Sequence, residues 1–122
     1  MEKTDLNAIA NNIAGTVRGI PYSGVLPKVG GGWGQSVGSD FYGGTIVEVA
    51  PDFTWLKTDL TTYAAFDYRK NSIHYGRYVF ATPKENGRGF RFDKTIHAVY
   101  CIRMNICHIY EDPQKNELDP SF

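Results

Sequence analysis

The clearest pattern in the chain is an alternation of side-chain character from Thr95 to Tyr110, TIHAVYCIRMNICHIY. Its even-numbered positions are nearly all apolar, whereas its odd-numbered positions include the polar side chains of His97, Arg103 and Asn105. A repeat of two is typical of a β-strand, and many of these residues favour strands. Fully extended, the run would span roughly 50 Å, so we expect this spine of the fold to bend, or to break near Asn105.

The middle of the chain shows the same period in shorter pieces. Pro51 followed by Asp52 suits a type I turn between two alternating segments, which predicts a hairpin. A second pair of strands follows, and Gly76 inside it indicates a bulge or a close approach by another group. A polar loop then precedes one more short strand. The predicted strands cover residues 45–49, 53–58, 61–68, 72–81 and 90–92.

The N-terminal segment departs from period two. Leu6, Ile9, Ile13 and Val17 recur at helical spacing after Thr4, a suitable N-cap residue. This pattern predicts one short N-terminal helix that covers a face of the sheet.

Residues 19–44 are dense in glycine and lack a clear period, which predicts a long loop over an opening or on a neighbouring subunit. Aromatic residues such as Trp33 and Tyr42 within it indicate partial order. The glycines at 30–34 are not a P-loop, because its lysine, its hydroxyl residue and a following helix are missing.

These patterns together predict a mainly β protein: a small antiparallel β-barrel or sandwich with one short N-terminal helix and a long glycine-rich loop. We expect a single β-rich domain over residues 1–112, followed by a polar C-terminal tail over residues 113–122.

The composition excludes some partners. Thirteen Lys and Arg residues balance thirteen Asp and Glu residues, so no global field favours polyanions, and we do not expect non-specific nucleic-acid binding. The chain shows neither a secretion signal nor an apolar run long enough to span a membrane, and we expect a soluble, cytoplasmic protein. Cys101 and Cys107 would lie about 20 Å apart on a straight strand, too far for an intrachain disulfide.

Catalytic and metal sites find little support. His74, His97, His108 and the two cysteines fall late in the chain, but strand spacing would not bring them around one metal ion. A nucleophilic pair of Cys101 and His108 would require a turn at 104–105, where turn-forming residues are missing. We therefore assign no catalytic residue, metal ligand or cofactor.

An anion pocket is the best-supported chemistry. Arginines that lie in strands among aromatic residues can pair with a phosphate while a ring stacks on a base, and this needs only local positive charge. Alternatively, these arginines pair with nearby carboxylates or reach solvent. The predicted ligand-binding residues are Arg103, Arg77, His97, Asn105, Tyr75, Arg91 and Trp33.

The sequence thus predicts a non-enzymatic binding module, expected to form a homo-oligomer, that sequesters a small phosphate-containing or nucleotide-like ligand. Small phage-encoded antagonists of signalling molecules act in this way, although no motif is shared with them. One alternative is a protein inhibitor or assembly subunit that contacts its partner through the exposed aromatics of the 19–44 loop. Another is a small hydrolase or phosphodiesterase with His97 or His74 as general base.

Overall fold

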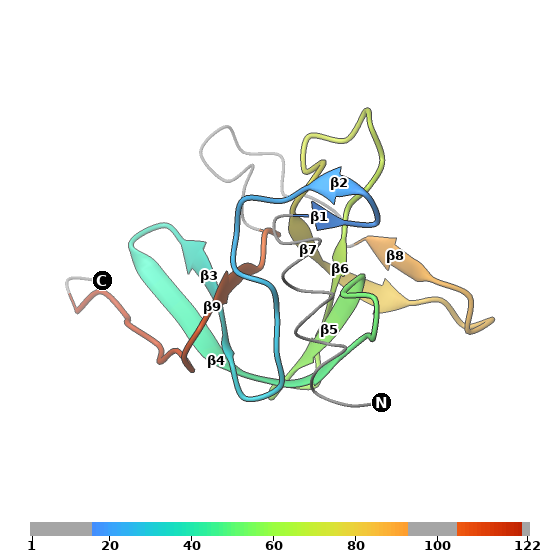
Figure 1. Ribbon diagram of the computed structural model, residues 1–122. Helices are drawn as coiled ribbons and strands as arrows, with labels where there is room; N and C mark the ends of the chain where they lie inside the picture. The colour runs from blue at the N-terminus through green and yellow to red at the C-terminus, as the bar shows by residue number, and fades with distance from the viewer. Residues whose placement is uncertain (1–15, 93–104, 121–122) are drawn as a thin grey trace.

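The computed structural model describes residues 16–92 and 105–120, and this part of the chain forms nine β-strands and no helix (Figure 1). β1 (Thr16–Val17) and β2 (Ile20–Pro21) form a small antiparallel sheet. The other strands form one antiparallel sheet in the order β8-β7-β6-β5-β4-β3-β9. They are β3 (Gly32–Val37), β4 (Asp40–Val49), β5 (Trp55–Thr58), β6 (Tyr63–Phe66), β7 (Tyr78–Pro83), β8 (Phe90–Phe92) and β9 (His108–Tyr110).

The mainly β prediction is confirmed, but the barrel is not found, because neither sheet of the described residues closes on itself. The predicted N-terminal helix is not shown. Its positions up to residue 15 lie outside the described residues, and its last position, Val17, lies in β1 instead.

The predicted hairpins are confirmed in their pairing. β4 pairs with β5 through the turn that begins at Pro51, β6 pairs with β7, and β8 lies where a short strand was expected. β7, however, begins only at Tyr78. The prediction of a strand over residues 72–77 is wrong, because a buried carboxylate at Asp67 binds this segment into a loop, as described below.

The prediction of a long glycine-rich loop over residues 19–44 is also wrong, since β2, β3 and the start of β4 lie there. Glycine hides the period of two because it leaves strand positions without a side chain. A Cβ atom on Gly32 would meet the main-chain oxygen of Asp112, and one on Gly34 would meet the ring of Phe41. These glycines allow neighbouring segments to approach β3 closely.

The end of the predicted spine connects two distant parts of the sheet. β9 pairs with β3, whereas Ile106, two residues before it, forms an isolated bridge with Val79 of β7. The predicted strand over residues 95–104 lies outside the described residues. The described segment 105–110 thus runs from β7 to β3, and it forms a wall of the site described below.

Residues 112–119 lie beside β4, near the C-terminus in Figure 1. Phe41 and Glu117 exchange two backbone hydrogen bonds of 2.8 and 2.7 Å, and the Gln114 amide donates to the Gly44 carbonyl at 3.0 Å. Backbone pairing therefore attaches much of the predicted polar tail to the sheet, although most of its side chains are exposed.

The core lies on one face of the larger sheet, where side chains of β3 to β7 and β9 meet. Tyr22 extends it from the segment after β2, with its ring edge-on to both Phe66 and Tyr78. The buried cluster comprises Val17, Trp33, Ile46, Leu56, Ala64, Phe66, Tyr78, Cys107 and Ile109.

Candidate functional site

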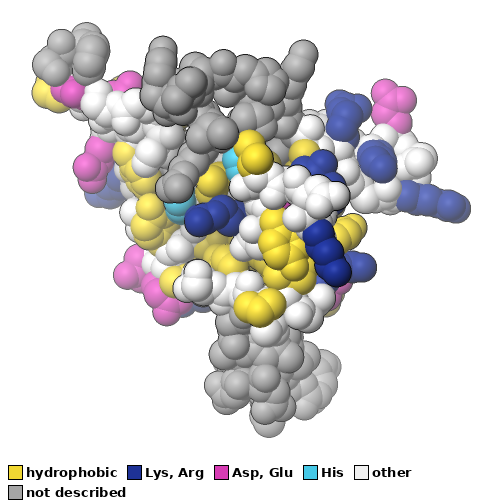
Figure 2. Space-filling model, turned by 90° about the horizontal axis from the view of Figure 1, so that it is seen from above, with side chains coloured by type: hydrophobic (Ala, Val, Ile, Leu, Met, Phe, Trp, Pro, Cys, Tyr) yellow, Lys and Arg dark blue, Asp and Glu magenta, His cyan; other side chains and the backbone are white. Residues whose placement is uncertain are grey.

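An open cleft of about 390 Å³ lies between three chain segments that are distant in sequence. Residues 21–24 begin at the last residue of β2, residues 75–78 lead into β7, and residues 106–110 include β9. Figure 2 views the molecule from the end that carries β1 and β2, and it shows hydrophobic side chains interspersed with Lys, Arg and His side chains. This cleft is the candidate site.

Arg77 supplies positive charge to the cleft. Its side chain is exposed, and it forms no ion pair with another described residue. Burial raises the pKa of the Tyr22 hydroxyl, and the charge of Arg77 partly offsets this increase, which places the guanidinium near that ring. An anion entering the cleft would therefore meet a cation that no described carboxylate neutralises.

Aromatic side chains line the cleft on several sides. Tyr22 donates a hydrogen bond from its hydroxyl to the Val25 carbonyl at 2.9 Å, and Tyr78 donates one to the Phe53 carbonyl at 2.5 Å. These bonds fix two of the tyrosines. Tyr75 is 39% exposed and Tyr110 is half-buried, so both leave ring surface available for stacking.

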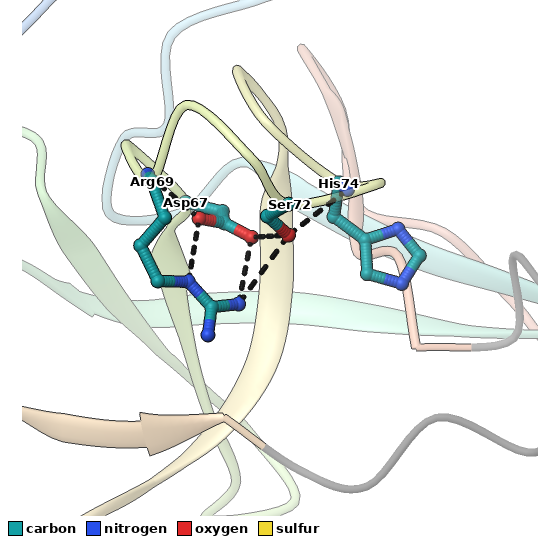
Figure 3. Close-up of polar contacts among 4 residues, drawn as sticks. All are labelled: Asp67, Arg69, Ser72 and His74. Atoms are coloured by element: carbon teal, nitrogen blue, oxygen red, sulfur yellow. Dashed lines mark hydrogen bonds and ion pairs between the residues drawn. The ribbon is translucent and has the colours of Figure 1, made fainter.

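The loop of residues 67–77, which carries Tyr75 and Arg77, is organised around the fully buried carboxylate of Asp67 (Figure 3). Arg69 donates to both carboxylate oxygens, from Nε at 3.0 Å and from Nη2 at 2.9 Å, and its backbone amide donates at 3.0 Å. The Ser72 hydroxyl also donates to this carboxylate. The loop thus has a fixed internal anchor.

Backbone hydrogen bonds from Asp67 also close the loop at its far end. Its amide donates to the Arg77 carbonyl at 2.9 Å, and its carbonyl accepts from the Gly76 amide at 2.7 Å. Gly76 has a φ of +80°, a conformation that side chains other than glycine rarely adopt. The same residue therefore anchors the loop and positions Arg77 at the cleft.

The charge state of the anchor follows from these contacts. Burial raises the pKa of Asp67, but the hydrogen bonds from Arg69 and Ser72 outweigh burial and hold the pKa below its usual value of 3.8. The hydrogen bond to Asp67 correspondingly raises the pKa of Arg69. The pair is charged at neutral pH, so the anchor is intact there.

His74 is close to this network but is not part of a catalytic triad. Its backbone amide donates to the Ser72 hydroxyl at 3.1 Å, whereas its ring points away from Asp67 and Ser72 (Figure 3). The ring is buried, and its Nε2 atom has no hydrogen-bond partner among the residues that the structure describes. The geometry therefore does not present His74 as a base for the Ser72 hydroxyl.

Burial of His74 predicts a pH-dependent stability. Burial lowers its pKa below the usual value of 6.5, and the charges of Arg69 and Arg77 lower it further, against an increase from Asp67. The unfolded chain therefore binds this proton more readily than the folded chain does. We expect the free energy of unfolding to be highest above pH 6.5 and to fall as the pH decreases from there towards the folded-state pKa.

Urea unfolding of the wild type and of His74→Phe across this pH range measures the contribution of His74. The variant should lose much of the decrease in stability below pH 6.5, because its side chain does not titrate. Equal pH slopes for the two proteins would show that other groups cause the dependence.

The predicted site residues are dispersed by the fold. Arg77 and Tyr75 line the cleft, and Asn105 immediately precedes its 106–110 wall. Arg91 is exposed on β8 and does not line the cleft. His97 and Arg103 lie outside the described residues.

Trp33 is in the core rather than in a loop over the cleft. It is 3% exposed, its indole Nε1 donates to Asp59 at 2.9 Å, and its ring packs edge-on against Phe80. Substitution of Trp33 would therefore perturb folding before it tested any binding function.

Most residues that line the cleft were not predicted as ligand-binding, and Tyr22, His108 and Tyr110 are among them. His108 and Tyr110 belong to the predicted spine, but alternation along one strand does not indicate which strand pairs with it. Tyr22 was assigned to the glycine-rich loop, and only the antiparallel pairing of β1 with β2 turns the chain towards the cleft.

Cys107 also lines the cleft, but it is a buried free cysteine, and burial raises the pKa of its thiol. A protonated thiol is a poor nucleophile and a poor metal ligand. Cys101 lies outside the described residues. Across residues 16–92 and 105–120, no group of three or more His, Cys, Asp or Glu side chains is arranged to hold a metal ion.

The described residues define a small antiparallel β protein with an open cleft of tyrosine and arginine side chains. None of its described segments forms a helix that is long and apolar enough to cross a membrane. Comparisons with protein-family models, curated proteins and solved structures give no match.

Proposed function

We propose that this chain is a binding protein that holds a small phosphate-containing ligand with a planar ring, such as a nucleotide, in the cleft. The observation that carries the proposal is Arg77, whose exposed guanidinium has no ion pair to another described residue and lies among tyrosines. A guanidinium can donate two parallel hydrogen bonds to a phosphate.

The tyrosines supply the second half of the recognition. A planar base can stack on the exposed ring of Tyr75, while the fixed ring of Tyr22 forms a wall beside it. Because the Asp67 anchor holds the loop that carries Arg77, little ordering of the chain would oppose ligand binding. The biological role that we propose is sequestration of the ligand.

Isothermal titration with ribonucleoside monophosphates, and with inorganic phosphate as a fragment, tests this function. Wild-type protein should bind at least one nucleotide, and Arg77→Ala should weaken that affinity about 10-fold or more, as expected for loss of a charge-assisted hydrogen bond. The matched control is Arg91→Ala, which removes an exposed arginine that does not line the cleft.

The control should retain wild-type affinity. Binding that is equally strong in wild type and Arg77→Ala would contradict the proposal, and so would no binding of any nucleotide to the wild type.

A further inference from the structure

A second groove, of about 400 Å³, lies on the opposite face of β5 to β8 from the core. We call it the aromatic groove and define it by residues that line it: Arg18, Trp55, Tyr63, Tyr68, Phe90 and Phe92.

Strand register explains why aromatic side chains gather there. Residues paired across antiparallel strands share a face, and Tyr63, Ala81 and Phe92 form one such row, as Trp55 and Ala65 form another. The alanines are too small to fill the surface between the rings. The next residue along β5, Leu56, points to the other face and is fully buried in the core. The strand register therefore gathers the aromatic rings on this face, and the small alanines leave the groove between them.

The rings of the groove support one another and still leave surface exposed. The centroids of Trp55, Tyr63 and Phe90 lie 5.7 to 6.0 Å apart, and all three side chains are only partly buried. Tyr68 is 50% exposed. Because the rings contact one another, they hold their positions and keep flat apolar surfaces exposed to a ligand.

Cationic side chains lie over these rings. The Arg18 guanidinium is 4.6 Å from the ring centroid of Tyr68, and the Lys57 ammonium is 5.5 Å from that of Tyr63. Arg18 has a φ of 51°, in the left-handed region that residues other than glycine and asparagine adopt uncommonly, next to Gly19 in the turn between β1 and β2. Glycine or asparagine would fit this position with less strain, so the arginine is present at a cost in stability.

Charge is segregated in the molecule although the whole chain is neutral. Residues 67–92 contain six Lys and Arg against Glu85 and the Asp67 that pairs with Arg69, whereas residues 105–120 contain four Asp and Glu and one Lys. Figure 2 shows Lys and Arg gathered on the side of β8, with Asp and Glu mainly on the opposite side. The aromatic groove thus lies on the basic side.

We propose that the aromatic groove binds single-stranded nucleic acid. Bases would stack on the rings of Trp55 and Tyr63, and backbone phosphates would pair with Arg18 and Lys57, as in surfaces that combine aromatic platforms with basic side chains. A duplex would not expose the base faces that these rings require. The balanced net charge led us to expect no non-specific nucleic-acid binding. The proposal departs from that expectation because binding depends on the positive charge near the groove rather than on the charge of the whole chain.

Fluorescence anisotropy of a labelled oligothymidylate of about 12 nucleotides tests the proposal, with a duplex of equal length for comparison. The full-length wild type should bind the single strand more tightly than the duplex, with an affinity that falls as salt rises. Binding should also quench the fluorescence of Trp55, the partly exposed member of the two tryptophans. Trp55→Ala should weaken binding about 10-fold.

Arg18→Gly separates binding from folding. It removes the guanidinium and relieves the unfavourable φ, so the thermal midpoint should not fall, while the slope of log affinity against log salt should decrease by about 1. The matched controls are Tyr42→Ala, an exposed tyrosine of β4, and Lys115→Ala, a cation on the acidic side, both expected to bind as the wild type does.

No preference for the single strand would overturn the proposal. Unchanged binding in both Trp55→Ala and Arg18→Gly would overturn it as well. The proposal would also be overturned if the wild type formed an oligomer that Trp55→Ala dissociates. In that case the groove would bind the acidic side of a second copy of the chain. The proposal is independent of the cleft, because Arg77→Ala should leave oligothymidylate binding unchanged.

Discussion

Replacing Asp67 with alanine should lower the free energy of unfolding by about 3 kcal/mol and disorder the loop of residues 67–77. The substitution removes the acceptor for the Arg69 side chain, the Arg69 amide and the Ser72 hydroxyl. Arg69 can return to water, because its side chain is 56% exposed, but the interior of the loop loses its anchor. Since the loop carries Arg77, nucleotide binding in the cleft should weaken as well.

Denaturant unfolding measures this effect, with Ser72→Ala as the matched milder change. The serine variant removes one donor to the carboxylate and the acceptor for the His74 amide but leaves the paired charges in place, so its cost should be smaller, about 1 kcal/mol. If Asp67→Ala were as stable as the wild type to within about 0.5 kcal/mol, the anchoring role of the carboxylate would be refuted.

Replacing Gly32 with alanine should cost about 3 kcal/mol and separate the segment after β9 from the edge of β3. The new Cβ atom would meet the main-chain oxygen of Asp112, which cannot rotate away as a flexible side chain could. Hydrogen exchange should therefore accelerate at the amides of Gln114 and Glu117, which bond to β4.

Ser36→Ala is the matched control for this prediction, since it adds no atom at an exposed position of the same strand. It should change stability by less than about 0.5 kcal/mol and leave the exchange of those amides unchanged. Wild-type stability in Gly32→Ala would show that the Asp112 segment moves without cost.

The sequence predicts strands best where side chains, rather than glycines, carry the alternation. The β4 and β5 hairpin was predictable because alternating positions flank Pro51, whereas β3 was missed because Gly32 and Gly34 remove its pattern. Residues 72–77 also alternate, but the Asp67 carboxylate binds the Arg69 amide as a local turn would, and this overrides the strand pattern.

The cleft was predictable only in part. Arg77 and Tyr75 were identified because they are close in sequence, and an arginine beside tyrosines already indicates an anion site within one short segment. Tyr22 and Tyr110 come from elements far away in sequence, and only strand pairing brings them to the same cleft. The aromatic groove was missed for the same reason, since Arg18, Trp55, Tyr63 and Phe90 come from segments far apart in sequence.

Nuclear magnetic resonance titration of the isotope-labelled full chain with ribonucleoside monophosphates tests the cleft most directly, because each amide reports its own position. The proposed function predicts concentration-dependent shifts at residues 22–24, 75–78 and 106–110 that disappear in Arg77→Ala and persist in Arg91→Ala. Shifts confined to the aromatic groove, or no shifts at all, would contradict the assignment of the cleft as the ligand site.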